Sequence, residues 1–327
     1  MHQQKVLVTA CRFGRLRQRV AVAFMPRQYF KVSKPCWNAN SRHFSLSSRV
    51  AGNSSVDATP DSPYTLIHVT QQDGLRTITM NDKKTRNSLS LHMMNELISA
   101  ITKDKSSKEL RCIVITATNE SPVFSSGHNL KELTSDQGVA AQKNVVSTCT
   151  ELILSIRNAE VPVIAVINGL AAAAGCQLVA SCDFSVATEK SSFSTPGASF
   201  GLFCSTPGVS VSRAVNRSTA AFLVLTGQSL SAKDALNANL VTKVVPEEKL
   251  ESCVQEIYKS ISSKSRSVVQ LGRQFFYEQL EMPYEKALRE GENVMVRNMQ
   301  LKDCQEGLQS FKAKRHPAWS HNDDKVS

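Results

Sequence analysis

Two short segments rich in small residues constrain this chain more than any other feature: VFSSGHNL at 123–130 and NGLAAAAGCQL at 168–178. Each follows an apolar, β-branched run, 113–115 or 161–167, and each is expected to end by opening a helix. Small residues at such a turn let the backbone approach a ligand, and the first N–H groups of a helix have no intrahelical acceptor. The sequence therefore predicts two turns able to direct two backbone N–H groups at one carbonyl oxygen, which is an oxyanion hole.

The positive charge of the chain lies almost wholly in its leader. The 327 residues carry a formal net charge of +11, but ten basic and no acidic residues precede Asp57. The remainder therefore holds 29 basic against 28 acidic residues. Because that remainder is nearly neutral, no nucleic-acid partner is expected.

The leader, residues 1–60, is rich in arginine and is rich in serine near 41–55. Apolar residues are spaced among its arginines. This composition is typical of a mitochondrial transit peptide, whereas a secretory signal needs one unbroken apolar core. The alternative is a basic tail that binds RNA or acidic surfaces, and the lack of acids favours the import signal. We therefore expect a transit peptide, a disordered linker and a location in the mitochondrial matrix.

Cysteine usage and one long apolar stretch exclude other classes. The nine cysteines are scattered and form no CxxC pair, which is neither a disulfide framework nor a zinc pattern, so no metal site is expected. The uncharged stretch 161–182 is long enough to raise the question of a membrane span. However, Pro162, Asn168, Gly169 and Gln177 divide it into strand, turn and helix. We interpret it as the centre of a core and expect no transmembrane segment.

Strands and helices alternate along the middle of the chain. The expected strands are 64–69, 75–80, 111–117, 161–167 and 184–187. The expected helices are 91–103, 139–158, 217–226, 231–238, 247–262, 265–279, 284–300 and 303–313. Gln72-Asp73-Gly74 predicts a hairpin turn, and Ser90 an N-cap. The pattern indicates an α/β fold with βαβ-like crossovers, followed from about residue 216 by an almost wholly helical portion.

These segments, taken in order, resemble the crotonase, or enoyl-CoA hydratase/isomerase, superfamily over roughly residues 62–319. The matching blocks are NDKKTRNSLS, VFSSGHNLKEL, VPVIAVINGLAAAAGCQLVASCDF, FSTPGASFGL, LTGQSLSAKDALNANLVTKVV and EGLQSFKAKRHPAW. The resemblance implies a spiral of ββα units in residues 61–255 and a helical C-terminal oligomerisation region in 256–327. It also implies a homotrimer or a dimer of trimers, and a coenzyme A thioester as substrate or ligand without a covalently bound cofactor.

The resemblance also implies roles for particular residues. The backbone N–H groups of His128 and Ala174 take the positions of the two oxyanion-hole donors. The resemblance also implies six positions that contact coenzyme A. Lys84 lies near a phosphate, and three residues of the first segment border adenine and pantetheine. Two residues of the last helix close over coenzyme A, often from a neighbouring subunit. The last five of these are Ser126, Asn129, Leu130, Phe311 and Lys314.

The chain departs from the family where hydration needs proton carriers. The two glutamates of hydratases fall on Gln177 and Gly197, and a third acid position of some isomerases falls near Ser205. None of these residues ionises at neutral pH, and positioned acid–base groups contribute about 100- to 10,000-fold each. Hydration is therefore not expected, unless a carboxylate such as Glu132 arrives from elsewhere.

Other side chains near these positions have alternative interpretations. Gln177 either orients a polar group through its amide or simply packs. The His128 ring is a surrogate acid or base, or lies along the coenzyme A path. Cys204 and Ser205 are thioester nucleophiles or, as the lack of a neighbouring base favours, packed side chains. Asp183 is expected to have a structural partner.

Three functions remain open at this point. The chain is an acyl-CoA-binding protein of fatty-acid metabolism that keeps the oxyanion hole without the acid–base pair. It is alternatively a decarboxylase of a malonyl-type CoA, or another enzyme that forms an enolate and needs few side chains. The last possibility is a non-catalytic acyl-CoA sensor or structural partner.

Overall fold

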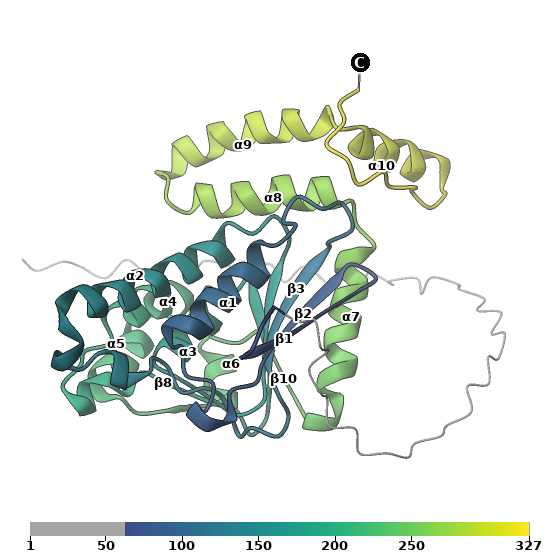
Figure 1. The fold of residues 1–327 in the computed structure, drawn as a ribbon. Helices are drawn as coiled ribbons and strands as arrows, with labels where there is room; N and C mark the ends of the chain where they lie inside the picture. Colours follow the sequence, from purple (N-terminus) through teal and green to yellow (C-terminus); the bar gives the residue numbers. More distant parts are fainter. Residues whose placement is uncertain (1–62, 327) are drawn as a thin grey trace, which may run out of the picture. The chain divides into compact units, whose positions relative to one another are not determined.

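The expected alternation of strands and helices is present in the computed structural model, which describes residues 63–326 (Figure 1). The predicted transit peptide and linker fall in 1–60, outside the described residues. A six-stranded sheet contains β1 (Ile67–Gln72), β2 (Leu75–Met80), β3 (Cys112–Ala117), β5 (Val163–Ile167), β7 (Phe184–Thr188) and β10 (Lys243–Val245), in that order. Its strands run parallel apart from the antiparallel β1–β2 pair. This arrangement confirms the predicted α/β class.

A second, four-stranded sheet carries the two segments singled out from the sequence. Its strands are β4 (Val123–Ser125), β6 (Leu170–Ala172), β8 (Ser192–Ser194) and β9 (Leu230–Ser231), in that order. Strands β4, β6 and β8 are parallel, and β9 pairs antiparallel with β8. Because parallel neighbours end at the same edge, the turns that follow β4 and β6 lie side by side.

Ten α-helices are described. They are α1 (Leu91–Thr102), α2 (Gly138–Arg157), α3 (Ala174–Ser181), α4 (Ser205–Ala214), α5 (Arg217–Thr226), α6 (Ala232–Asn237), α7 (Leu250–Ser262), α8 (Arg266–Gln279), α9 (Tyr284–Met299) and α10 (Lys302–Ala313). Short 3-10 helices are η1 (Lys83–Thr85), η2 (Leu130–Glu132), η3 (Ser135–Gln137), η4 (Pro196–Phe200) and η5 (Glu247–Lys249). No helix among the described residues is both long and apolar enough to span a membrane.

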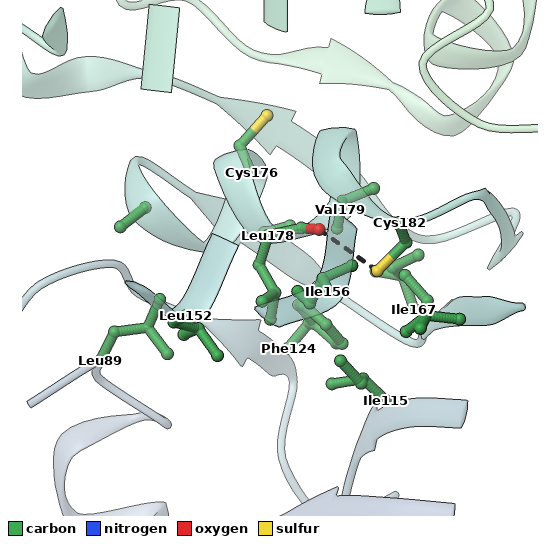
Figure 2. Packing of buried hydrophobic residues seen from close by; sticks show 14 of the residues in the cluster. Leu89, Ile115, Phe124, Leu152, Ile156, Ile167, Cys176, Leu178, Val179 and Cys182 are labelled. Atoms are coloured by element: carbon green, nitrogen blue, oxygen red, sulfur yellow. Dashed lines mark hydrogen bonds between the residues drawn. The ribbon is translucent and has the colours of Figure 1, made fainter. Parts of the chain in front are cut away.

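The alternating side chains of the central strands divide the core between two faces of the large sheet. Ile113 and Ile115 of β3 pack in the main cluster with α1, α2 and α3, part of which Figure 2 shows. Cys112 and Val114 point the other way, into a smaller cluster with α7. Both faces of the sheet are thus covered by helices, as parallel sheets require (Figure 1).

Local signals at the start of the fold are confirmed. The hairpin between β1 and β2 turns at Asp73 and Gly74, whose φ angles are +51° and +89°. The Ser90 side chain accepts a hydrogen bond from the N–H of Met93 and caps α1. The turn chemistry and the cap were therefore sufficient to locate these boundaries.

Three expectations about local structure differ from the structure. The first segment does not open an α-helix: it enters η2, where the Asn129 side chain accepts from the N–H of Lys131, and the next α-helix begins only at Gly138. The expected strand 64–69 is displaced to β1. The C-terminal portion also contains strands β9 and β10, which pair with β8 and β7.

Candidate active site

The two turns at the end of β4 and β6 are in direct contact. Val123 pairs with Leu170, and Ser125 with Ala171, so the turns begin at the same level. A Cβ on Gly127, which has φ +87°, would lie 2.8 Å from the Cβ of Ala173 and 3.2 Å from the backbone nitrogen of Ala174. Only glycine permits both this φ and this approach. Gly127 therefore allows the two segments to meet.

The second turn is strained at Ala173, a non-glycine residue with φ +49° and ψ −117°. Its N–H donates to the carbonyl of Ser194 at 2.8 Å, and its carbonyl accepts from Gln177 at 3.0 Å. Backbone strain of this kind costs about 1–3 kcal/mol and persists where surrounding structure imposes it. The strained turn makes Ala174 the first residue of α3, so its N–H has no intrahelical acceptor.

The first turn exposes the corresponding N–H of His128. The neighbouring carbonyl of Gly127 accepts from Leu89 at 2.7 Å, and the N–H of Ser126 donates to Arg86 at 3.1 Å. Within residues 63–326, neither the N–H of His128 nor that of Ala174 has an acceptor. Two unpaired backbone donors thus come from adjoining turns, which is the requirement of an oxyanion hole.

The His128 ring is half-buried, next to the Leu89 carbonyl and the charge of Glu132. Burial lowers its pKa below the ordinary 6.5, and the Leu89 carbonyl and the charge of Glu132 oppose this only in part. Its Nδ1 is buried and has no partner among the described residues. The ring is therefore neutral at pH 7, with an unsatisfied acceptor or donor at Nδ1.

Glu132 does not supply the missing carboxylate. Its Oε2 accepts from the N–H of Leu91 at 3.0 Å, at the start of α1, and its Oε1 accepts from the Asn129 side chain at 3.3 Å. A carboxylate at a helix N-terminus satisfies an N–H that the helix leaves free. Glu132 is accordingly committed to holding η2 against α1.

Gln177, which the resemblance aligns with the first hydratase glutamate, is 4% exposed. It stands three residues after Ala174 on α3, so both face the same side of that helix. Its Oε1 accepts a weak hydrogen bond from the Cys149 thiol of α2 at 3.8 Å. This contact could not be predicted from the sequence, because the two residues are 28 positions apart on different helices.

Gly197 and Ser205, which the resemblance aligns with the other two acid positions, have no acidic side chain. The N–H of Gly197 donates to the Sγ of Cys204 at 3.3 Å. Burial raises the pKa of that thiol, which the Gly197 N–H partly offsets, so Cys204 is a poor nucleophile at neutral pH. Ser205 is exposed at the start of α4, where its hydroxyl contacts only the Phe203 carbonyl, at 3.5 Å.

Four predicted coenzyme A contacts lie around the first turn. Lys84 is exposed on η1, and the hydroxyl of Ser126 donates to the carbonyl of the adjacent Thr85 at 3.1 Å. Asn129 caps η2, and Leu130 is 53% exposed beside it. The structure therefore brings Lys84, Ser126, Asn129 and Leu130 to one region.

Phe311 and Lys314 are not part of this region within one chain. Both are exposed near the end of α10, which packs against α8 and α9 (Figure 1). Their predicted role, contributed from a neighbouring subunit, stays a prediction. Among the described residues no group of His, Cys, Asp or Glu is arranged to hold a metal ion.

Asp183 has the structural partner expected for it. Both of its carboxylate oxygens accept from Arg273 Nε at 3.0 Å, and its Oδ2 also accepts from the N–H of Val163 at 2.6 Å. Tyr277 donates its hydroxyl to Oδ1 at 2.7 Å. This buried carboxylate joins α8 to the central sheet and takes no part in the site.

Comparisons with known proteins agree with the resemblance. The model of the family described as enoyl-CoA hydratase/isomerase matches residues 70–322. The mitochondrial enoyl-CoA hydratase domain-containing protein 3 of Rattus norvegicus is 48% identical over 293 residues, which cover 89% of this chain and 97% of the relative. The Homo sapiens protein of that name is 51% identical over 251 residues, covering 77% of this chain and 82% of the relative.

Solved structures give the same result. The crystal structure of human enoyl coenzyme A hydratase domain-containing protein 3 is 49% identical, with a TM-score of 0.76, and covers 78% of this chain and 100% of that one. An enoyl-CoA hydratase from Mycobacterium smegmatis is 35% identical, with a TM-score of 0.75, over 78% of this chain and 99% of that one. These structures confirm the predicted fold. The predicted mitochondrial location is also confirmed, because the rat, mouse and human relatives are named as mitochondrial proteins.

Proposed function

This chain belongs to the enoyl-CoA hydratase/isomerase family, and from that premise we propose that it binds acyl-CoA thioesters in mitochondrial fatty-acid metabolism without acting as a two-glutamate hydratase. The observation that carries the proposal is the contact between the two turns. It sets the turns that carry the unpaired N–H groups of His128 and Ala174 side by side, while the resemblance aligns Gln177 and Gly197 with the two acids of hydratases.

The oxyanion donors act on the thioester carbonyl. Its oxygen gains negative charge whenever the α-carbon loses a proton or carbon dioxide, and two fixed N–H groups stabilise that enolate. Each such donor contributes about 3 kcal/mol in comparable sites. Only backbone is needed, so alanine and histidine serve as well as any other residue there.

Hydration requires more than this pair supplies. Water has to lose a proton as it attacks the β-carbon, and the α-carbon has to gain one. An amide, a glycine and an exposed serine hydroxyl do neither at neutral pH, and the carboxylate of Glu132 is committed to the α1 N-terminus. Crotonyl-CoA hydration is therefore expected to be lower by several powers of ten than in a glutamate-bearing relative.

Coenzyme A itself is held by the exposed rim in this proposal. Lys84 meets a phosphate, and Ser126, Asn129 and Leu130 border adenine and pantetheine. Phe311 and Lys314 complete the site from a neighbouring copy in a homotrimer or a dimer of trimers. The exposure of Lys84, Leu130, Phe311 and Lys314 in the single chain is compatible with this role.

Decarboxylation of a malonyl-type CoA is the second candidate. Carbon dioxide leaves with no base, so the reaction needs only the enolate to be held, and the pair of N–H groups is what the site retains. The subsequent protonation at the α-carbon then comes from water.

Calorimetry and turnover assays on the purified protein distinguish these functions. Binding of butyryl-CoA and crotonyl-CoA with neither hydration nor decarboxylation supports a non-catalytic acyl-CoA sensor or partner. Loss of carbon dioxide from malonyl-type CoA above the solvent rate supports the decarboxylase. Absence of affinity for every CoA ester overturns the proposal.

A further inference from the structure

The two ends of the Gln177 amide have different surroundings. Its oxygen, Oε1, accepts from the Cys149 thiol at 3.8 Å. Its nitrogen, Nε2, donates to none of the described residues, yet it is not among the described buried polar atoms that lack a partner. The exposed 4% of this side chain therefore includes the amide nitrogen.

The contact with Cys149 orients the oxygen and the nitrogen of the Gln177 amide. Its side chain is 1% exposed on the buried face of α2, and burial raises the pKa of the thiol to about 11. The thiol thus keeps its proton at physiological pH and is able to donate it, and the end of the amide that lies against it is Oε1, at 3.8 Å. The amide nitrogen is left to face the open side.

We infer from helix geometry that the Gln177 side chain extends toward the oxyanion donors. Gln177 follows Ala174 by three residues, and helical side chains lean toward the N-terminus of their helix, here the end that carries the Ala174 N–H. The backbone of Gln177 is fixed in this place, because its N–H donates to the Ala173 carbonyl at 3.0 Å and its carbonyl accepts from Ser181 at 2.7 Å.

We propose that Gln177, oriented by Cys149, presents its amide N–H groups to the acyl chain, so that the site selects CoA thioesters with a hydrogen-bond acceptor on the β-carbon. The inference rests on the proposed function, since it requires a bound thioester. The acceptor is either a neutral β-carbonyl or a β-carboxylate, as in a 3-oxoacyl or a malonyl-type CoA. A hydratase glutamate at this position offers only acceptor oxygens and repels a carboxylate. Gln177 is a specificity-determining residue here, and Cys149 is a positioning residue.

The direct measurement is the affinity of the full folded protein for three thioesters. Butyryl-CoA is the reference without an acceptor, acetoacetyl-CoA adds a β-carbonyl to the same chain, and malonyl-CoA carries a β-carboxylate. One satisfied hydrogen bond in a buried site gives a preference of about tenfold over butyryl-CoA, and a charged acceptor gives more. Comparison of acetoacetyl-CoA with malonyl-CoA distinguishes recognition of a carbonyl from recognition of a carboxylate. The malonyl-CoA is checked for integrity after each titration.

Variants separate orientation from packing. Gln177→Met is expected to abolish the preference, and Gln177→Glu to invert it for malonyl-CoA. Cys149→Ala is expected to reduce the preference because the amide is free to turn, and Cys149→Ser to retain it because a hydroxyl also donates to Oε1. The matched control is Cys182→Ala, which removes another buried thiol whose Sγ donates to the Leu178 carbonyl at 3.3 Å rather than to Gln177 (Figure 2).

Each outcome either supports or overturns the inference. The inference is supported if the wild type shows the preference, Gln177→Met and Cys149→Ala lose it, and Cys149→Ser and Cys182→Ala keep it. Equal affinity of the wild type for all three thioesters overturns it while leaving the proposed function intact. Absence of affinity for all three overturns the proposed function itself. Wild-type ratios suffice for this decision even if Cys149→Ala fails to fold.

Discussion

The Sγ of Cys204 lies 2.6 Å from the place that a Cβ on Gly197 would occupy, and it accepts a hydrogen bond from the Gly197 N–H at 3.3 Å. The carbonyl of Leu202 lies closer still to that place. The chain after η4 therefore folds back over Gly197, the residue that the resemblance aligns with the second hydratase glutamate, and fills the space that a Cβ there would need. A larger side chain at position 197 would require this loop to move.

Gly197→Glu is expected to destabilise the protein rather than restore hydration. Its Cβ would meet a backbone carbonyl and a buried thiol, and overpacking of this kind costs about 1–3 kcal/mol before the carboxylate is accommodated. Urea denaturation and a crotonyl-CoA hydration assay measure the two effects. A matched pair is Gly197→Ala against Gly208→Ala, because a Cβ on Gly208 meets only Val224, at 3.5 Å. Equal stability of these two alanine variants would contradict the prediction.

Gly127→Ala is expected to disrupt the contact between the two turns. Its added Cβ would lie 2.8 Å from that of Ala173, so Ala174 has to move. We therefore expect the affinity for acyl-CoA to fall at least tenfold. The free energy of unfolding is expected to fall by about 1–3 kcal/mol. Gly138→Ala is the control: φ is +78° there as well, but no atom lies within 4 Å of its Cβ. If both variants lose affinity alike, the close approach is not what matters.

Ala173→Gly is expected to stabilise the fold. The strained conformation at φ +49° and ψ −117° costs about 1–3 kcal/mol for alanine, and glycine adopts it freely. Since glycine loses about 0.5–1 kcal/mol of conformational entropy, a net gain of about 1 kcal/mol remains. The urea midpoint is the measurement, and Ala172→Gly in β6, which has no positive φ, should instead be destabilising.

Much of the fold was predictable because its signals are local. The hairpin at Asp73-Gly74, the cap at Ser90 and the alternation of strands and helices each depend on a few consecutive residues. Helix α4 was missed because STPGVSVSRA has poor helix propensity. Val211 shows what compensates, since it is fully buried in the main core.

The site was predictable only in part, for a related reason. The turns at His128 and Ala174 could be predicted because small residues follow apolar, β-branched runs there. The contact between Cys149 and Gln177 and the thiol that covers Gly197 are tertiary, and no spacing in the sequence encodes them. The sequence therefore identified what the site lacks, while the packing around those positions needed the structure.

Acidification is expected to weaken the fold through His128. Its pKa is depressed in the folded protein, so this contribution to stability is complete above the unfolded value near 6.5 and is lost as pH falls through the folded pKa. Between the unfolded pKa and the lower folded pKa the slope approaches at most about 1.4 kcal/mol per pH unit for one proton. His128→Gln should flatten the decline between pH 7 and pH 5, measured by urea denaturation at each pH. The same slope in both proteins would assign the decline to other groups.

The buried pair of Arg273 and Asp183 is expected to contribute far more to stability than the surface pairs of the same helical portion. Arg273 is 8% exposed and also donates to the carbonyls of Arg157 and Ile156, at 2.9 and 2.8 Å. Arg273→Met leaves the Asp183 carboxylate buried without its cation, which costs about 3–5 kcal/mol in the free energy of unfolding.

A surface pair provides the comparison, because Arg297 and Glu290 of α9 are 3.2 Å apart but largely solvated. Arg297→Met is expected to change stability by less than about 1 kcal/mol. The double variant Arg273→Met with Asp183→Asn should cost less than the sum of its single changes, since no unpaired charge remains. Urea denaturation of the wild type and of the four variants (the two single variants, the double variant and Arg297→Met) measures these differences. Additive losses would mean that Arg273 holds α8 through the backbone carbonyls alone.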